Sequence, residues 1–506
     1  MRVSGAPIAC LEGVARERLA GRLVLAVLWT LVGTLIAVYL GVFVLSAWAR
    51  LPFPAEFTYG ESIVLAGAQR IARGEPLYPP PDQLPLIVSA YMPLYYLLVG
   101  GLQRLFGDGY TVGRVVSLVA TFAAAALLTW SVRGVSGRWY GGLLAGGLFL
   151  TQNMTVMLWA PLHRVDTLAL CWTLAGLALA TAGRAHLAAL PLVLALLTKQ
   201  TYLVAPIAVA LTIRPRRSAL TFGGLVLGGL AAAIAVGQAQ SDGWLLWYTA
   251  VANANAYWLS YLQLQLELFL RFNALSLLAA AALFLLPTRP DERLWRWYFI
   301  GTALTLPSIG KVGASSNYWL ELTAASSAMI GILAVRLAEL PGWRVALARA
   351  GLAGALLAAL LVSLPGYRAA IGEALVVLPA GGAGAVRAQL ELAPFVAAEP
   401  GNLLTDDPAL AIAAGKPILF EFVIFRLLAE QGLWDERPIL EAITAQRFEL
   451  VALRTPLETP LADAEWTAGM RDALRAAYVP AGQMADHWLY RPIGLPDRLA
   501  RRPGEP

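Results

Sequence analysis

Residues 23–48 read LVLAVLWTLVGTLIAVYLGVFVLSAW, and residues 57–81 follow as FTYGESIVLAGAQRIARGEPLYPPP. The first stretch has no charged residue and is longer than the roughly 20 apolar residues that cross a hydrocarbon core. It is also too long for the apolar region of a signal peptide, so we interpret it as a retained membrane span. The second stretch predicts an amphipathic helix that begins at Glu61 and stops at Gly74. The chain therefore leaves a membrane and at once presents a carboxylate at the start of a helix.

The composition of the whole chain is that of a polytopic membrane protein. Of its 506 residues, 58% are hydrophobic and only 14% are charged, whereas soluble proteins carry about 25% charged residues. The net charge of +6 does not indicate a nucleic-acid partner, because topology decides where a membrane protein places its basic residues. The two cysteines, Cys10 and Cys171, form no spacing motif, so neither a disulfide framework nor a cysteine zinc site is implied.

The arginine-rich gaps between apolar runs predict the topology, because short loops rich in Arg and Lys stay in the cytoplasm. Placing all of these gaps on one side predicts about eleven spans, with residues 1–22 cytoplasmic. The predicted spans lie near 23–48, 113–132, 139–159, 166–183, 185–198, 202–213, 219–238, 270–287, 295–309, 319–337 and 350–364. The membrane domain then covers residues 23–364, with a first outside loop at 49–112.

Two apolar stretches allow more than one interpretation. Residues 91–106 would move every later basic gap to the other side if they crossed, so we predict that they form a helix in the outer interface. Residues 185–213 could form one long span, but two short spans hinged near Lys199 keep the next basic gap in the cytoplasm.

From Pro365 onward, polar residues alternate with apolar ones and turn signals such as TDDP (405–408) reappear. The predicted strands and helices are RFELVAL (447–453), HWLYRP (487–492), 421–431 and 464–477. Residues 365–506 thus predict a small α/β domain outside the membrane, which carries no acid–base constellation and is expected to be accessory. The predicted fold class is an all-α polytopic membrane protein with interfacial helices in its first outside loop and a small C-terminal α/β extracytoplasmic domain.

Ionisable residues gather on the predicted outside loops. Because burying such residues at membrane depth costs free energy, their grouping suggests a functional site. Glu61 is a candidate catalytic base, because the helix dipole holds a carboxylate at a helix N-terminus ionised and a base must be ionised to accept a proton. The competing interpretation is that Glu61 only caps its helix, and Glu56 is the alternative base. Asp166, at the start of the fourth span, is the second catalytic candidate. An N-cap paired with Arg164 is the competing interpretation.

Lys199 and Lys311 are candidates to bind a phosphate, since a lysine at membrane depth needs an anion or the interface. Arg114 is a third candidate, because it faces outward against the positive-inside trend. The candidate substrate-binding residues are Asn253, Asn317, Tyr318 and Glu321. Snorkelling of Lys199 and an aromatic belt at the outer interface are the competing interpretations. His163 stands alone, and we recognise no set of metal ligands.

The order of these pieces resembles the GT-C superfamily of membrane glycosyltransferases, and within it the protein O-mannosyltransferases and the bacterial lipid A aminoarabinose transferases. The matching pieces, within residues 20–340, are GESIVLAGAQRIARGEPLYPP, YMPLYYLLVGGLQRLFG, GRVVSL (113–118) and LHRVDTLAL (162–170). The resemblance implies that Glu61 is the first-loop acid, which acts as base or orients the acceptor. These families more often show Asp there, commonly in an Asp-Glu pair. The resemblance also implies that Asp166 is a second acid, which faces Glu61 across a cavity.

The function that the resemblance implies is inverting transfer of a sugar from a polyprenyl-phosphate-linked donor to a lipid, glycan or protein acceptor. The site would lie on the outer face of a bacterial cytoplasmic membrane, among membrane lipids and without nucleic acid. No cofactor is expected, although the sequence does not decide whether a divalent cation is required. The sequence has no Gly-rich phosphate loop, as expected for a donor without a nucleotide. The alternative function is a transporter or flippase of lipid-linked sugars, a class that often shows paired halves and broken helices.

Overall fold

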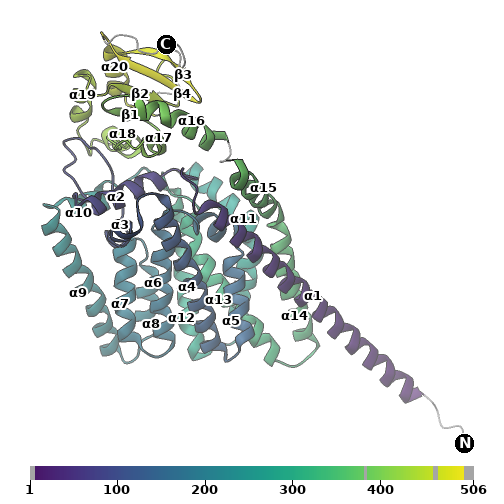
Figure 1. Cartoon of the computed structure of the whole chain (residues 1–506). Helices are drawn as coiled ribbons and strands as arrows, with labels where there is room; N and C mark the ends of the chain where they lie inside the picture. The colour runs from purple at the N-terminus through teal and green to yellow at the C-terminus, as the bar shows by residue number, and fades with distance from the viewer. Residues whose placement is uncertain (1–5, 381–383, 460–464, 495–506) are drawn as a thin grey trace, which may run out of the picture.

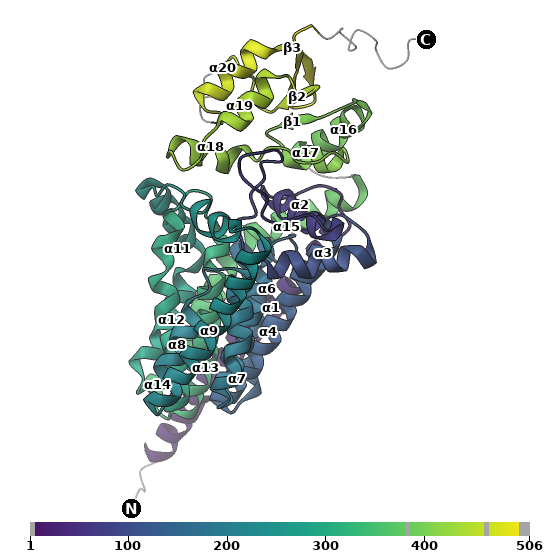
Figure 2. The ribbon, with the colours of Figure 1, turned by 90° about the vertical axis from the view of Figure 1, so that its left-hand side faces the viewer.

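The structure is a computed structural model of the chain, and it describes residues 6–380, 384–459 and 465–494. A bundle of long helices forms one end of the molecule and a small sheet with short helices forms the other (Figure 1). The short helices of the predicted first outside loop lie between these two parts, and the first helix, α1 (Ala6–Arg50), begins at the far end of the bundle (Figure 2).

The bundle consists of apolar helices whose order follows the predicted spans. Their bounds are α1 (Ala6–Arg50), α4 (Tyr110–Ser136), α5 (Trp139–Leu150), α6 (Asp166–Thr181), α7 (Ala185–Thr198), α8 (Val204–Thr212), α9 (Arg216–Gln240), α11 (Leu259–Ala281), α12 (Arg293–Leu304), α13 (Leu320–Glu339) and α14 (Trp343–Val362). Helix α13 is the central one and is buried along almost its whole length. Its run of small residues, AASSA (324–328), allows its neighbours to approach closely.

Six helices of the described residues are long and apolar enough to cross a membrane, by length and composition alone. They are Leu19–Arg50, Tyr110–Ser136, Arg216–Gln240, Leu259–Leu285, Ser316–Glu339 and Trp343–Gly372. The remaining bundle helices have between 9 and 16 residues, which is short of the roughly 20 that a span needs. The structure thus supports a polytopic membrane protein, and the count of about eleven spans stays a prediction.

The first outside loop forms two helices of 13 residues each, α2 (Glu61–Arg73) and α3 (Leu94–Phe106). Gly60 before α2 and Gly74 after it both have left-handed backbone conformations, so the helix begins and ends where the sequence predicts. Helix α3 is too short to cross a membrane and packs on α2 at the end of the bundle (Figure 1). Gly100 makes this crossing close, because a Cβ there would lie 2.6 Å from the backbone oxygen of Ala68.

The segment before α11 differs from the predicted one. The predicted spans leave residues 239–269 between the seventh and eighth spans, whereas α11 already begins at Leu259. Two short elements precede it, α10 (Trp244–Leu246) and a π-helix at Trp247–Val251. The aromatic residues of this segment continue into a helix that packs on the bundle, and an aromatic belt at the outer interface stays a prediction.

The C-terminal part contains a four-stranded sheet in the order β1-β2-β4-β3, in which β1 and β2 are parallel and the other pairs antiparallel. The elements are α15 (Leu364–Ala380), α16 (Gly384–Ala398), β1 (Leu403–Thr405), α17 (Pro408–Ala413), α18 (Phe422–Glu430), α19 (Arg437–Thr444), β2 (Leu450–Leu453), α20 (Ala468–Ala477), β3 (Tyr478–Met484) and β4 (His487–Pro492). Helix α15 still packs along α1, where Tyr367 stacks on Tyr39 with ring centroids 3.7 Å apart.

The C-terminal part is joined to the first outside loop by backbone hydrogen bonds. The backbone N–H of Leu86 donates to the oxygen of Leu419, and the N–H of Glu421 donates to the oxygen of Leu86, both at 2.8 Å. Trp434 adds a bond from its indole N–H to the oxygen of Pro81 at 2.6 Å. These contacts fix the position of the C-terminal part over the end of the bundle.

Gly100 provides a test of the close α2–α3 crossing. Gly100→Ala places a methyl group against backbone and against Ile71, and such overpacking costs about 1–3 kcal/mol. We expect a lower midpoint of thermal unfolding for the detergent-purified protein. Gly101→Ala is the matched control, since no heavy atom lies within 4 Å of its added Cβ and Ala favours a helix over Gly by up to about 1 kcal/mol. Equal midpoints for the two variants would contradict the crossing.

Candidate active site

Glu61, the first residue of α2, is fully buried and ion-paired with Arg114 of α4. Arg114 Nε donates to Glu61 Oε1 at 2.7 Å, and its Nη2 donates to Oε2 at 3.0 Å. The backbone N–H groups of His163 and Phe57 donate to the same carboxylate at 2.7 and 3.0 Å. Burial opposes ionisation of Glu61, but Arg114 and these hydrogen bonds outweigh it and hold the pKa of Glu61 below its usual range.

Arg114 is also fully buried, and the ends of its guanidinium bind backbone oxygens of the first loop. Nη1 donates to the oxygens of Arg50 and Phe53 at 2.8 and 2.6 Å, and Nη2 donates to that of Ala55 at 2.7 Å. Glu61 and Arg114 were predicted as catalytic base and phosphate ligand. The structure brings them together, but in a closed cluster, and neither lines a cavity described below.

A second buried ion pair joins Asp166, at the start of α6, to Lys199, directly after α7. Lys199 Nζ donates to Asp166 Oδ1 at 2.5 Å, and Asn317 Nδ2 donates to the same oxygen at 2.9 Å. Arg164 Nε lies 3.8 Å from Asp166 Oδ2. Three predicted site residues are thus in direct contact, although they come from distant parts of the sequence.

The central cavity, as we name it, has a volume of about 160 Å³ and lies between the end of the bundle, the first loop and α18. Five predicted residues line it: Lys199, Lys311, Asn253, Asn317 and Tyr318. A bundle cavity of about 380 Å³ adjoins it, sharing both lysines, Asn317 and Tyr318, and adding Glu321. Most of the predicted binding residues are therefore gathered around two adjoining cavities.

The charge of the central cavity is mainly positive. Arg164, Lys199 and Lys311 line it, and Glu421 is the one acidic lining residue among those that the structure describes. Lys311 Nζ has no hydrogen-bond or ion-pair partner within the described ranges, unlike Lys199. Burial, and then the neighbouring Lys199, lower the pKa of Lys311, so an anion bound here would stabilise both ammonium groups.

Sequence reasoning missed three residues that line the central cavity: Tyr59, Tyr91 and Glu421. Tyr91 receives a hydrogen bond from Arg164 Nη2 at 2.9 Å, and Tyr59 donates a short hydrogen bond to Glu421. The YMPLYY segment was recognised only as interfacial, and nothing local in the sequence marks Glu421. Asn253 lines the cavity but uses its amide N–H to hold the backbone of Ala90 at 2.6 Å.

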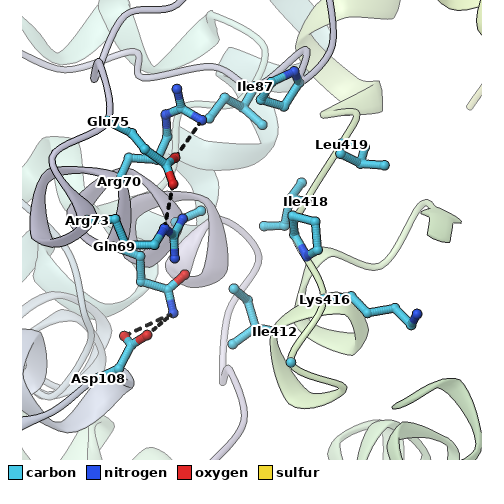
Figure 3. Close-up of a pocket in the computed structure, with 14 residues that line it drawn as sticks. Gln69, Arg70, Arg73, Glu75, Ile87, Asp108, Ile412, Lys416, Ile418 and Leu419 are labelled. Carbon is cyan, nitrogen blue, oxygen red and sulfur yellow. Dashed lines mark hydrogen bonds and ion pairs between the residues drawn. The ribbon is translucent and has the colours of Figure 1, made fainter. Parts of the chain in front are cut away.

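Another cavity, of about 530 Å³, lies between α2 and the C-terminal part and serves as a contrast (Figure 3). Its cations are all engaged, because Arg70 and Arg73 both pair with Glu75, and Lys416 donates to two backbone oxygens.

Within the described residues, no three His, Cys, Asp or Glu side chains gather as a metal site requires. His163 instead packs its buried ring against Tyr95.

Solved structures of two other membrane proteins share the fold described above. ArnT from Cupriavidus metallidurans, bound to undecaprenyl phosphate, matches with a TM-score of 0.62 and 12% identity, covering 91% of this chain and 98% of that one. The archaeal oligosaccharyltransferase AglB from Archaeoglobus fulgidus, in complex with an inhibitory peptide and a dolichol-phosphate, matches with a TM-score of 0.53 and 13% identity, covering 91% and 75%. No protein-family model and no curated protein matches the chain.

The Glu61–Arg114 pair leads to a prediction about stability. Glu61→Gln keeps most hydrogen bonds but leaves a buried guanidinium without a counter-charge, and removing one partner of a buried pair costs about 3–5 kcal/mol. We expect a strongly lowered unfolding midpoint. Glu75→Gln, at a 39% exposed carboxylate of the same loop, should cost at most about 1 kcal/mol. A Glu61→Gln variant as stable as Glu75→Gln would show that the pair does not hold the loop.

Glu56 leads to a prediction about pH. Burial raises the pKa of this carboxyl to about 7, although the Ser62 N–H and hydroxyl that bind it act in the opposite direction. An unfolded Glu titrates near pH 4.3, so the stabilisation from its proton is complete below about pH 4.3. It is lost as the pH rises towards about 7. Glu56→Gln should therefore raise the unfolding midpoint at pH 8 but not at pH 4. The same gain at both pH values would contradict this assignment.

Proposed function

We propose that the protein is a membrane glycosyltransferase that transfers a sugar from a polyprenyl-phosphate-linked donor to an acceptor. The observation that carries the proposal is the cationic central cavity at the end of an apolar helix bundle with this fold. A lipid-linked donor has an apolar chain that remains in the membrane and a phosphate at its boundary. Lys199 and Lys311 lie where such a phosphate would be bound, and Lys311 has no competing partner among the described residues.

In the proposed reaction, an acceptor oxygen or nitrogen attacks the anomeric carbon while the bond from that carbon to the phosphate oxygen breaks. The electron pair of this bond stays on the polyprenyl phosphate, whose charge increases. Lys199 and Lys311 stabilise that developing charge, which is an effect larger in the transition state than in the ground state. A single displacement of this kind inverts the anomeric centre, and it needs no nucleotide.

Glu61 and Asp166 act in this proposal as positioning residues. Glu61 holds Arg114 and, through it, the first loop that carries Tyr59. Asp166 holds Lys199 and Asn317, and so orients two residues that line both cavities. Neither carboxylate lines the central cavity, so neither contacts the donor in this arrangement.

We propose that the central cavity lies on the outer face of a bacterial cytoplasmic membrane. The turns between α4 and α5, between α8 and α9 and between α13 and α14 carry basic residues and lie at the end of the bundle opposite the sheet (Figure 1). Basic turns stay cytoplasmic, which leaves the central cavity and the C-terminal α/β part outside. In this topology residues 365–506 form an extracytoplasmic domain.

A flippase for lipid-linked sugars is the alternative function, and it would also need a cationic cavity. Transporters bind their cargo near the middle of the membrane, between repeats, whereas the residues of the central cavity lie at one end of the bundle. The two functions differ in the fate of the donor. A transferase releases polyprenyl phosphate, while a flippase moves intact labelled lipid between the leaflets of a vesicle.

Binding of undecaprenyl phosphate to the purified protein tests the proposal. Lys311→Met should weaken this binding at least about tenfold, because a charge-assisted contact contributes about 1.5–3 kcal/mol. Lys416→Met is the matched control, since Lys416 binds only backbone oxygens outside the central cavity. Titration of the intrinsic tryptophan fluorescence measures both affinities. Equal affinity of wild type and Lys311→Met, or no binding by wild type, would overturn the assignment.

A further inference from the structure

We propose that Glu421, contributed by the C-terminal part, is the carboxylate that accepts the proton of the attacking acceptor, with Tyr59 as its hydrogen-bond partner. The inference rests on the proposed transferase function of the central cavity. It assigns a catalytic role to the part of the chain that the sequence predicts to be accessory. It also assigns the base to a residue other than Glu61.

Glu421 lies at the wall of the central cavity that faces away from the bundle. Its side chain is almost fully buried, and it lines the same space as Lys199 and Lys311. Its Oε1 accepts a short hydrogen bond from the Tyr59 hydroxyl, and its Oε2 accepts one from the backbone N–H of Ile424 at 3.0 Å. The cavity therefore has ammonium groups from the bundle on one side and a carboxylate from the C-terminal part on another.

The position of Glu421 is fixed by the backbone on both sides. Its own N–H donates to the oxygen of Leu86, which joins it to the first outside loop. Its side chain caps the N-terminus of α18, so the helix orients the carboxylate. Tyr59, two residues before Glu61, lies in the loop that the Arg114 cluster holds. A base fixed in this way keeps its geometry without reorganisation when the acceptor binds.

Comparison with the other acids around the two cavities singles out Glu421. Glu61 is paired with Arg114, and Asp166 with Lys199, so their negative charges are compensated by cations. Glu321 lines only the bundle cavity, where Tyr298 donates to it at 3.1 Å. Glu421 lines the central cavity and has no ion-pair partner in the described parts of the chain.

The surroundings of Glu421 also suit proton transfer chemically. Burial raises its pKa, while the bonds from Tyr59 and the start of α18 partly oppose that rise. A carboxylate whose conjugate acid has a raised pKa is a stronger base than an exposed one. In the step itself, the acceptor O–H or N–H bond breaks towards Glu421 as the acceptor bonds to the anomeric carbon. The polyprenyl phosphate departs with the electron pair of its bond, so charge and atoms balance.

The test uses the full-length protein, undecaprenyl phosphate carrying a radiolabelled hexose or pentose, and an envelope extract as acceptor. Glu421→Gln keeps the size and one hydrogen-bond acceptor of the side chain, but it removes proton-accepting ability. We expect release of undecaprenyl phosphate to fall by about 10²–10⁴-fold, the usual contribution of a general base. Binding of undecaprenyl phosphate should remain within about twofold of wild type, since the lysines carry it. Glu430→Gln, at an exposed acid at the other end of α18, is the control.

Tyr59→Phe gives a second readout, which a purely structural role would not change. The Tyr59 hydroxyl lowers the pKa of Glu421, so its loss should move the acidic limb of the pH–rate profile to higher pH. The other ionisable groups that line the cavity are Tyr91, Tyr96, Tyr318, Arg164, Lys199 and Lys311. An unchanged acidic limb in Tyr59→Phe would overturn the pairing with Glu421, even if Glu421→Gln fails to fold.

The outcomes separate this inference from the proposed function. If wild type neither binds undecaprenyl phosphate nor releases it from any donor tested, the transferase proposal fails and this inference fails with it. If wild type is active and a folded Glu421→Gln variant stays within about threefold of it, well short of a general-base contribution, only the assignment of Glu421 fails.

Discussion

The ion pair between Glu61 and Arg114 is the contact on which the end of the bundle that carries the first loop depends. Arg114 donates hydrogen bonds to carbonyl oxygens at the end of α1 and in the following loop. Glu61 accepts hydrogen bonds from the backbone N–H groups of Phe57 and His163. A buried ion pair stabilises a fold only when nearly every donor and acceptor has a partner. Here the pair satisfies backbone groups of the loop that would otherwise be buried without partners. The loop that carries Tyr59 and Tyr91 can therefore lie closely over the bundle.

Most cations around the cavities have an ion-pair partner, and these pairs stabilise the structure. A cation without such a partner is free to bind a ligand. Arg114 is paired with Glu61, and Arg70 and Arg73 are paired with Glu75. Lys199 is intermediate, since it is bound to Asp166 but still lines both cavities. Lys311 alone among these cations lacks a partner in the described residues and also lines a cavity. An anionic ligand gains most where the protein has left a cation uncompensated, and for this reason we propose that the donor phosphate binds beside Lys311.

Local patterns predicted the order of the helices, the bounds of α2 between Gly60 and Gly74, and the non-crossing length of α3. They also identified Lys199, Lys311, Asn317 and Tyr318 as candidate binding residues, because a polar side chain beside an apolar run is unusual. The partners of these residues could not be predicted, since Glu61 meets Arg114 and Asp166 meets Lys199 through tertiary packing. Glu421 was missed for the same reason. It follows an ordinary turn in the sequence, and tertiary contacts such as the backbone hydrogen bond to Leu86 bring it to the cavity.

The contact between Leu86 and Glu421 means that two parts of the chain together form the central cavity. The bundle supplies the cations on one side of the central cavity, and the C-terminal part supplies an acid on the other. In the proposed reaction the donor phosphate has the same chemistry whatever sugar it carries, so lysines on a rigid bundle would suit its binding. In the same proposal the acceptor is the variable reactant, and it would meet Glu421 of the smaller sheet-containing part. Leu86 joins the two parts through backbone hydrogen bonds and through its buried side chain, which packs in one cluster with Phe420, so Glu421 keeps its position relative to the lysines.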